Sequence, residues 1–425
     1  MNRRKFLIGS AALGVLSSLK LPSRALAADF TPPRYMISVL AFGGFDPLFF
    51  CNPSTNPNWN RISQGGVGSA NGLRYSTGGI PQGSLNNTEY AQLVDNATFF
   101  QRWGSHCTVF NGIQTGGVGH PTSRLKAMTG GGTVANPHPT LPALVGARWN
   151  ANAPFGLLST GGVEITQGLL PLVRGARARS VQDLIQVSGN LGSDIESKIS
   201  QHAVQKAQRI GETSAFASHR QSANSWKNAF EQGESIASFV VPTYGTSEDP
   251  VGTVASECEA AKVMLHAFSQ GYAAAGNISV TGYDHHAEID ANHPIQIGEL
   301  CALLDYIMAE SKRLGIHKDL AVYVTSDFGR SPGYSSNDDD AGKSHWPIGS
   351  VMVLSQAYPG GREIGSTDSE MRPIPVDMQS LRPSSSGISL TTAIVHQAVR
   401  QLTGVSDTML DQQYELIGPS LPVFV

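Results

Sequence analysis

Aspartate and histidine side chains that could hold a metal ion are spread along this chain. They are Asp46, His120, Asp284, His285 or His286, Asp327 and His345. Mixed oxygen and nitrogen ligands suit Zn²⁺, Mn²⁺ or another divalent ion, and two such ions about 4 Å apart can hold an anionic ester for hydrolysis. No HxH or HExxH motif places two ligands together in the sequence. The fold must therefore bring these side chains to one place.

One aspartate follows the clearest predicted core strand. Leu320–Val324 is a short apolar run without Pro or Gly, which indicates a buried parallel strand. Asp327 comes just after it, and open α/β sheets bind their ligands at the carboxyl ends of such strands. The simpler alternative is that Asp327 caps the next turn.

Two further strands end in the same way. Arg34–Ala41 is followed by two glycines and Asp46, and Ile278–Thr281 is followed by Asp284 and a pair of histidines. A helix predicted from Ile295 to Leu314, with Pro294 in its first turn, leads from the second of these to the Leu320 strand. A right-handed β-α-β crossover would place Asp284 and Asp327 at the same edge of the sheet.

A glycine-rich segment, residues 116–132, carries His120. Glycines flank a short helix predicted from Thr122 to Met128, and a helix N-terminus is a natural anion site. The alternative is that Thr122 caps the helix and His120 is solvated.

The order of these segments predicts an α/β fold, a mostly parallel central sheet with helices on both faces. Residues 136–175 are rich in Pro and Gly and are expected to be irregular. Residues 180–240 are polar and are predicted to form a helical insertion in one domain of residues 28–425. The 425 residues carry a net charge of −3 without any Lys/Arg block, which gives no indication of nucleic-acid binding.

The N-terminus has the pattern of an export signal. Arg3 and Arg4 precede an apolar run, Leu7–Leu19, and a small-residue cleavage pattern ends at Ala27. Paired arginines are typical of a twin-arginine signal, and an ordinary secretion signal is the alternative. We therefore expect residues 1–27 to be removed, a periplasmic or secreted location, and no membrane span in the mature chain.

The motifs, in order, read GGFD, GHPTSR, YDHH, TSDFGR and SHW. This order resembles the bacterial family called domain of unknown function 1501, whose members are exported by the twin-arginine route and belong to the alkaline phosphatase/sulfatase superfamily. The resemblance covers most of the mature chain and is weak in the helical insertion. It implies an alkaline-phosphatase-like sandwich fold.

The resemblance also implies a set of metal ligands. Asp284, His286 and His345 match one site, and Asp46 and Asp327 match a second; the family register favours His286 over His285. It implies one or two divalent metal ions, zinc first, with manganese or calcium as alternatives. Two departures are visible, because Phe328 stands where active members have a histidine and Ser344 replaces an aspartate.

The nucleophile position also departs from the superfamily. Aligned on Thr129-Gly130, the sulfatase signature places His120 over its Cys or Ser, and Thr122, Ser123 and Arg124 over the following residues. His120 could be a metal ligand, or His120, Thr122 or Ser123 could be the nucleophile; a third possibility is a site that binds without catalysis. Arg124 could hold an anionic oxygen, or could form an ion pair in the sheet.

Two functions therefore remain open. The first is an exported metal-dependent hydrolase of a phosphate or sulfate ester, acting on a small anionic ester or a sulfated or phosphorylated glycan. The second is a non-catalytic exported protein that uses the same cleft to bind an anionic glycan or a protein partner.

Overall fold

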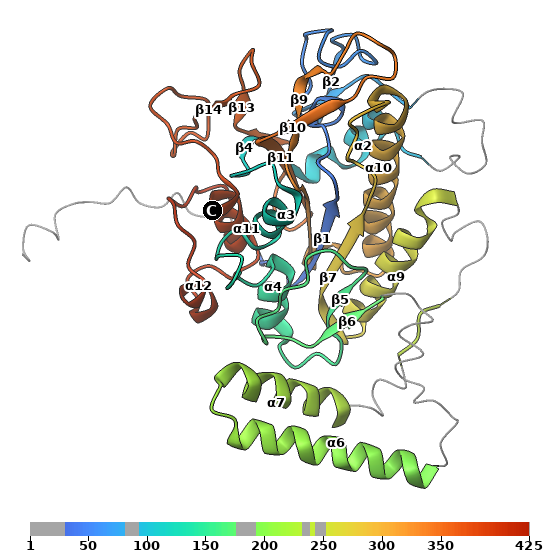
Figure 1. The fold of residues 1–425 in the computed structure, drawn as a ribbon, viewed down its shortest axis with the longest axis vertical. Coiled ribbons are helices and arrows are strands. Elements are labelled where there is room, and N and C mark those ends of the chain that lie inside the picture. Colours follow the sequence, from blue (N-terminus) through green and yellow to red (C-terminus); the bar gives the residue numbers. More distant parts are fainter. Residues whose placement is uncertain (1–29, 81–92, 176–192, 232–238, 243–251, 425) are drawn as a thin grey trace, which may run out of the picture.

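A central sheet organises the molecule (Figure 1). The structure is a computed structural model that describes residues 30–80, 93–175, 193–231, 239–242 and 252–424. Its eight-stranded sheet has the order β12-β4-β11-β8-β1-β7-β5-β6. The strands are β1 (Tyr35–Ala41), β4 (Cys107–Gln114), β5 (Gly156–Ser159), β6 (Leu172–Arg174), β7 (Ala273–Val280), β8 (Leu320–Ser326), β11 (Ile348–Ser355) and β12 (Arg362–Ile364).

Most neighbouring strands in this sheet are parallel. β1 pairs in parallel with β7 and β8, whereas β11 runs antiparallel to both β8 and β4. This confirms the predicted α/β fold with a mostly parallel sheet. Smaller antiparallel pairs are β2 (Val67–Ala70) with β3 (Leu73–Ser76), β9 (Gly329–Tyr334) with β10 (Lys343–Trp346), and β13 (Ser366–Thr367) with β14 (Pro373–Ile374).

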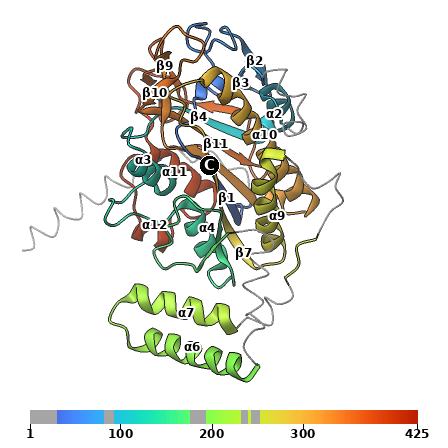
Figure 2. The ribbon, with the colours of Figure 1, turned by 45° about the vertical axis from the view of Figure 1, so that its right-hand side comes forward.

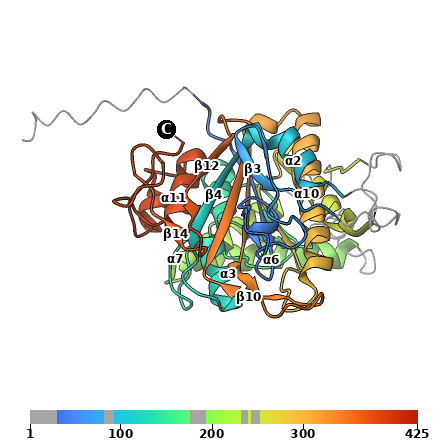
Figure 3. The ribbon, with the colours of Figure 1, turned by 90° about the horizontal axis from the view of Figure 1, so that it is seen from above.

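Helices cover both faces of the sheet (Figures 2 and 3). One face is covered by α2 (Asn96–Trp103), α9 (Ala255–Ser269) and α10 (Ile289–Arg313), and the other by α3 (His120–Thr129), α4 (Leu141–Asn150) and α11 (Thr392–Leu402). Side chains alternate along β1, so Ile37 and Val39 face the first group while Met36 faces the second. Both faces of β1 are therefore buried, as its continuous apolar run predicts.

The topology brings three predicted strand ends to one edge. α10 connects β7 to β8, and β1 lies between these two strands and parallel to both. The segments that follow β1, β7 and β8 carry Asp46, Asp284 and Asp327, so all three aspartates lie at the same edge of the sheet.

Two sequence-based expectations about local structure were wrong. α10 begins at Ile289, so Pro294 lies inside the helix and not in its first turn. Residues 136–175 are not irregular, because they contain α4, β5 and β6. Pro142 lies at the start of α4, where its missing N–H costs little; β5 is short and owes its strand form to pairing with β7.

The polar segment at residues 180–240 contains a helical hairpin. α6 (Ser193–Thr213) and α7 (Ala217–Glu231) pack on each other at the bottom of Figure 1. The predicted signal, residues 1–27, lies outside the described residues. In the part of the chain that the structure describes, no helix is long and apolar enough to cross a membrane.

Candidate metal centre

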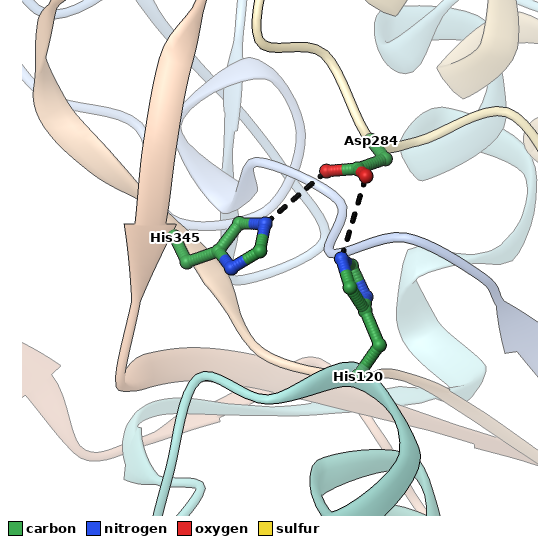
Figure 4. A group of neighbouring side chains, drawn as sticks. All are labelled: His120, Asp284 and His345. Carbon is green, nitrogen blue, oxygen red and sulfur yellow. Dashed lines mark hydrogen bonds and ion pairs between the residues drawn. The ribbon is translucent and has the colours of Figure 1, made fainter.

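Three side chains of types that can bind a metal ion meet at the edge of the sheet (Figure 4). Nε2 of His120 lies 3.4 Å from Oδ2 of Asp284, and Nε2 of His345 lies 3.3 Å from Oδ1 of the same carboxylate. One ligand atom from each of the three lies within 4.8 Å of the other two. His286 is next to them, with its Nε2 3.1 Å from Oδ1 of Asp284 and 3.0 Å from Nε2 of His345.

Separate elements supply these side chains. His120 is the first residue of α3, which a glycine-rich loop joins to β4. Asp284 and His286 lie in the loop after β7, and His345 lies in β10, opposite Arg330 of β9. The structure thus brings together His120, Asp284 with His286, and His345, from three segments that are far apart in the sequence.

The contacts of His120 fix its neutral tautomer. Its Nδ1 lies 2.6 Å from Oδ2 of Asp327, and an ionised carboxylate can only accept a hydrogen bond. In the neutral ring the proton therefore lies on Nδ1, and Nε2 carries a lone pair. This Nε2 is buried and makes no hydrogen bond, although it faces Asp284.

His345 is held in the same way. Its Nδ1 lies 2.9 Å from the carbonyl oxygen of Val118, which also can only accept. In the neutral ring the Nε2 lone pair then faces both Asp284 and Nε2 of His286. Two imidazole lone pairs thus converge on a carboxylate, an arrangement of acceptors that a cation between them would stabilise. Metal-bound histidines are typically anchored through their other nitrogen in this manner.

The spacing of the ligand atoms also fits a metal ion. Ligands about 2.0–2.1 Å from a tetrahedral zinc ion lie about 3.3 Å from one another. The 3.4 Å and 3.3 Å contacts of His120 and His345 with Asp284 match this spacing. The donor set of two imidazoles and one carboxylate suits zinc or another transition metal better than calcium.

Asp284 stays ionised at this position. Partial burial tends to raise its pKa, but the hydrogen bond and charge of Arg330 outweigh this and bring the pKa to about 2. Arg330 donates from one terminal nitrogen to Oδ1 of Asp284 at 2.5 Å. Burial also lowers the pKa of His286, with Asp284 opposing the shift, so the His286 ring is neutral at pH 7.

Arg330 is a part of the site that the sequence reasoning missed. Its side chain is completely buried, and its guanidinium donates to the carbonyl oxygens of Gly43, Gly44, Tyr283 and Lys343 as well as to Asp284. It therefore joins the loops after β1 and β7 to the β9–β10 hairpin. The only signal was its position at the end of the TSDFGR motif.

The structure does not bring Asp46 into the group. Its Oδ2 lies 2.6 Å from Nζ of Lys343, and its Oδ1 accepts from the backbone N–H of Leu48. Both charged side chains are fully buried. Burial raises the pKa of Asp46, and the charge of Lys343 opposes this shift.

Asp327 lies behind His120, outside the group of ligands. Its side chain is fully buried, and its contact with His120 orients that ring. Burial raises the pKa of Asp327, while the hydrogen bond from His120 and the charge of Arg124 lower it.

The residues predicted around the nucleophile are engaged elsewhere or buried. The Thr122 hydroxyl donates to the carbonyl of Gly119. The Ser123 hydroxyl is buried without a hydrogen-bond partner. Arg124 donates to the His120 carbonyl, covers the ring of Phe42 at 3.7 Å and lies 3.6 Å from Asp327, which corresponds to the ion-pair alternative.

Two neighbouring side chains complete the surroundings. The Phe328 ring lies 4.8 Å from the His120 ring and 4.4 Å from the His345 ring between centroids, so it forms an apolar wall. His285 is buried away from Asp284, and its Nδ1 lies 3.2 Å from Nδ1 of the fully buried His293. Of the two adjacent histidines, His286 is therefore the one beside the centre.

Comparison with known proteins finds one matching family model and several solved structures of low sequence identity. The family model described as "Protein of unknown function (DUF1501)" matches residues 180–398, just over half of the chain. No curated protein matches.

The solved structures that match are distant. Ps i-CgsB is 10% identical, with a TM-score of 0.41 over 93% of this chain and 76% of that one. The alkaline phosphatase from the Antarctic bacterium TAB5 is 12% identical, with a TM-score of 0.34 over 89% of this chain and 100% of that one. The PsFucS1 sulfatase from Pseudoalteromonas sp. is 10% identical, with a TM-score of 0.33 over 92% and 73% of the two chains.

Proposed function

This chain belongs to the DUF1501 family of proteins of unknown function, and we propose that it is a metal-dependent hydrolase of a phosphate or sulfate ester. The observation that carries the proposal is the convergence of two imidazole lone pairs on Asp284. His120, Asp284 and His345 would hold one divalent cation, zinc first. Three protein ligands with an open position are the usual pattern of catalytic zinc sites.

The chain's own residues suggest how the reaction would proceed. A bound divalent cation would supply a Lewis acid for the ester oxygen and for an attacking water. The side chains of Asp284 and His286 are about half exposed, so an ester can approach from the solvent side. Phe328 excludes water from the opposite side. The pKa of His286 is lowered, so its ring is neutral, and its Nε2 carries the proton because it faces Asp284 and the lone pair of His345. Its Nδ1 would therefore accept the proton of the attacking water as a general base.

We assign the attack to water and not to a side chain. Ser123 is buried, the Thr122 hydroxyl already donates to Gly119, and His120 is used as a ligand. The proposed location is the periplasm or the outside of the cell, on the basis of the paired arginines and the apolar run that follows them.

The proposal is tested by metal binding and by activity together. The exported protein, purified without chelator, should contain zinc, and the metal-free protein should take zinc up in isothermal titration calorimetry. His120→Ala or Asp284→Asn should weaken zinc binding at least 100-fold, because each removes a ligand of a small set. His219→Ala, on the exposed surface of α7, is the matched control and should bind zinc as the wild type does.

The same proteins should then be assayed with p-nitrophenyl phosphate and p-nitrophenyl sulfate. Hydrolysis that requires zinc and is lost in both ligand variants would support the proposal. A folded wild-type protein that takes up no added zinc would contradict it.

One observation favours the second function, binding without catalysis. Arg330, the arginine that contacts Asp284, is completely buried and its guanidinium already donates to protein oxygens, so it is not free to hold an ester anion. A protein that binds zinc and a sulfated glycan, yet hydrolyses neither test ester, would support this function.

A further inference from the structure

We infer that this centre takes one divalent cation and not two, because the ammonium group of Lys343 lies beside the Asp46 carboxylate, where a second cation would have to bind. The inference rests on the proposed function, since it concerns the same group of carboxylates. It assigns Lys343 a role that its place at the end of an acidic surface loop does not suggest.

Both carboxylate oxygens of Asp46 already accept hydrogen bonds from protein donors. Its Oδ2 lies 2.6 Å from Nζ of Lys343, and its Oδ1 accepts the Leu48 N–H at 3.0 Å. The carboxylate is fully buried, so it has no contact with solvent through which an ion could reach it. Asp46 also caps the short helix η1 (Pro47–Phe49), which fixes its orientation.

Lys343 is enclosed as firmly as its partner. Nζ also donates to the carbonyl of Trp59 at 2.5 Å, and the rings of Phe49 and Tyr334 lie 5.1 Å and 4.9 Å from it. A carboxylate, a carbonyl and two aromatic faces are the surroundings that a buried ammonium group requires. A second cation at Asp46 would have to expel this side chain from the core or remove its proton.

The other carboxylates at this edge are also paired with positive side chains. Arg330 lies 2.5 Å from Asp284, and Arg124 lies 3.6 Å from Asp327. Asp46, Asp284 and Asp327 are thus balanced one for one by Lys343, Arg330 and Arg124. Among the described residues at this edge, Asp284 alone also has the imidazole Nε2 atoms of His120 and His345 within 3.4 Å of its oxygens, so it is the one place that this arrangement provides for a divalent ion.

Zinc stoichiometry tests this inference. Metal-free full-length protein is titrated with zinc in isothermal titration calorimetry, and the loaded protein is dialysed and subjected to elemental analysis. We expect one zinc per chain in the wild type. The double variant Asp46→Asn/Lys343→Met removes both buried charges at similar volume, and it should also bind one zinc, with an affinity within about tenfold of the wild type.

The outcomes separate this inference from the proposed function. Two zinc ions per wild-type chain, falling to one in the double variant, would overturn the inference and leave the proposed function in place. No zinc in the wild type would overturn both. If the double variant does not fold, Lys343→Arg, which keeps the charge, serves instead and should again bind one zinc.

Discussion

At the scale of single residues, the tautomers of two histidines decide what the centre can bind. His120 and His345 each direct Nδ1 to an acceptor that the fold fixes in place. In each neutral ring, these contacts hold the proton on Nδ1 and so leave the lone pair on Nε2. This arrangement is prepared before any ion arrives, which reduces the cost of ordering the ligands on binding.

Replacing Asp327 tests this positioning without removing a ligand. In Asp327→Asn the carboxylate that accepts from Nδ1 of His120 becomes a neutral amide, which accepts less strongly and can also turn its NH₂ group toward the ring. We expect zinc affinity to fall about 10- to 100-fold, as for other partners of metal-bound histidines. Isothermal titration calorimetry measures this change.

Asp319→Asn provides the matched control at the opposite end of β8. Asp319 forms an exposed pair with Arg34 and has no contact with the centre, so its loss should leave zinc affinity unchanged. Wild-type affinity in Asp327→Asn would show that Asp327 does not orient His120.

The sequence could identify some of these residues and not others. Asp284 and His345 were found from the strand-end pattern and the family motifs, and the structure places them side by side with His120. The same pattern selected Asp46 and Asp327, whose side chains turn to Lys343 and His120 instead. Neither partner is near its aspartate in sequence, so these pairings arise only from the tertiary fold.

At the scale of elements, the turn after β1 sets how closely two loops approach. Gly43 has φ +122°, and a Cβ placed on it would lie 2.5 Å from the backbone nitrogen of Asp284. The turn therefore allows the loop that carries Asp284 to lie directly against the end of β1. A side chain at this position would push that loop away from His120 and His345.

Gly43→Ala should consequently weaken zinc binding at least tenfold and lower the free energy of unfolding by about 2 kcal/mol or more, from backbone strain and overpacking together. Zinc titration and urea unfolding measure the two effects.

Gly271→Ala is the control for strain alone. Gly271 also has positive φ, +82°, but no atom lies within 4 Å of its added Cβ. This variant should lose only about 1–2 kcal/mol and keep its zinc affinity. Equal zinc affinities in the two variants would contradict a positioning role for the turn at Gly43.

Periodicity and turn residues predicted most elements near the site because each carries its own local signal. β8 is a continuous apolar strand, and α3 lies between glycines where expected. α4 and β5 were missed because proline and glycine, which usually mark loops, here begin a helix and a short buried strand. The pairing of β5 with β7 overrides the local preference.

At the scale of the whole molecule, buried neutral histidines link folding to pH. Burial lowers the pKa of His285 to about 4, that of His396 to about 3, and that of His293 well below its ordinary value. In the unfolded chain these rings titrate near about 6.5. Between about pH 6.5 and 4 the unfolded state therefore binds more protons, and stability is lost as the pH falls through this range.

Urea unfolding of the zinc-free protein should show this loss directly. With up to three extra protons on the unfolded chain, the free energy of unfolding should fall by up to about 4 kcal/mol per pH unit below about pH 6. His396→Gln removes one of these rings and should reduce the slope by about a third, whereas His219→Ala, an exposed ring, should leave it unchanged. Stability that is equal at pH 7 and pH 5 would show that these rings already carry protons in the folded protein.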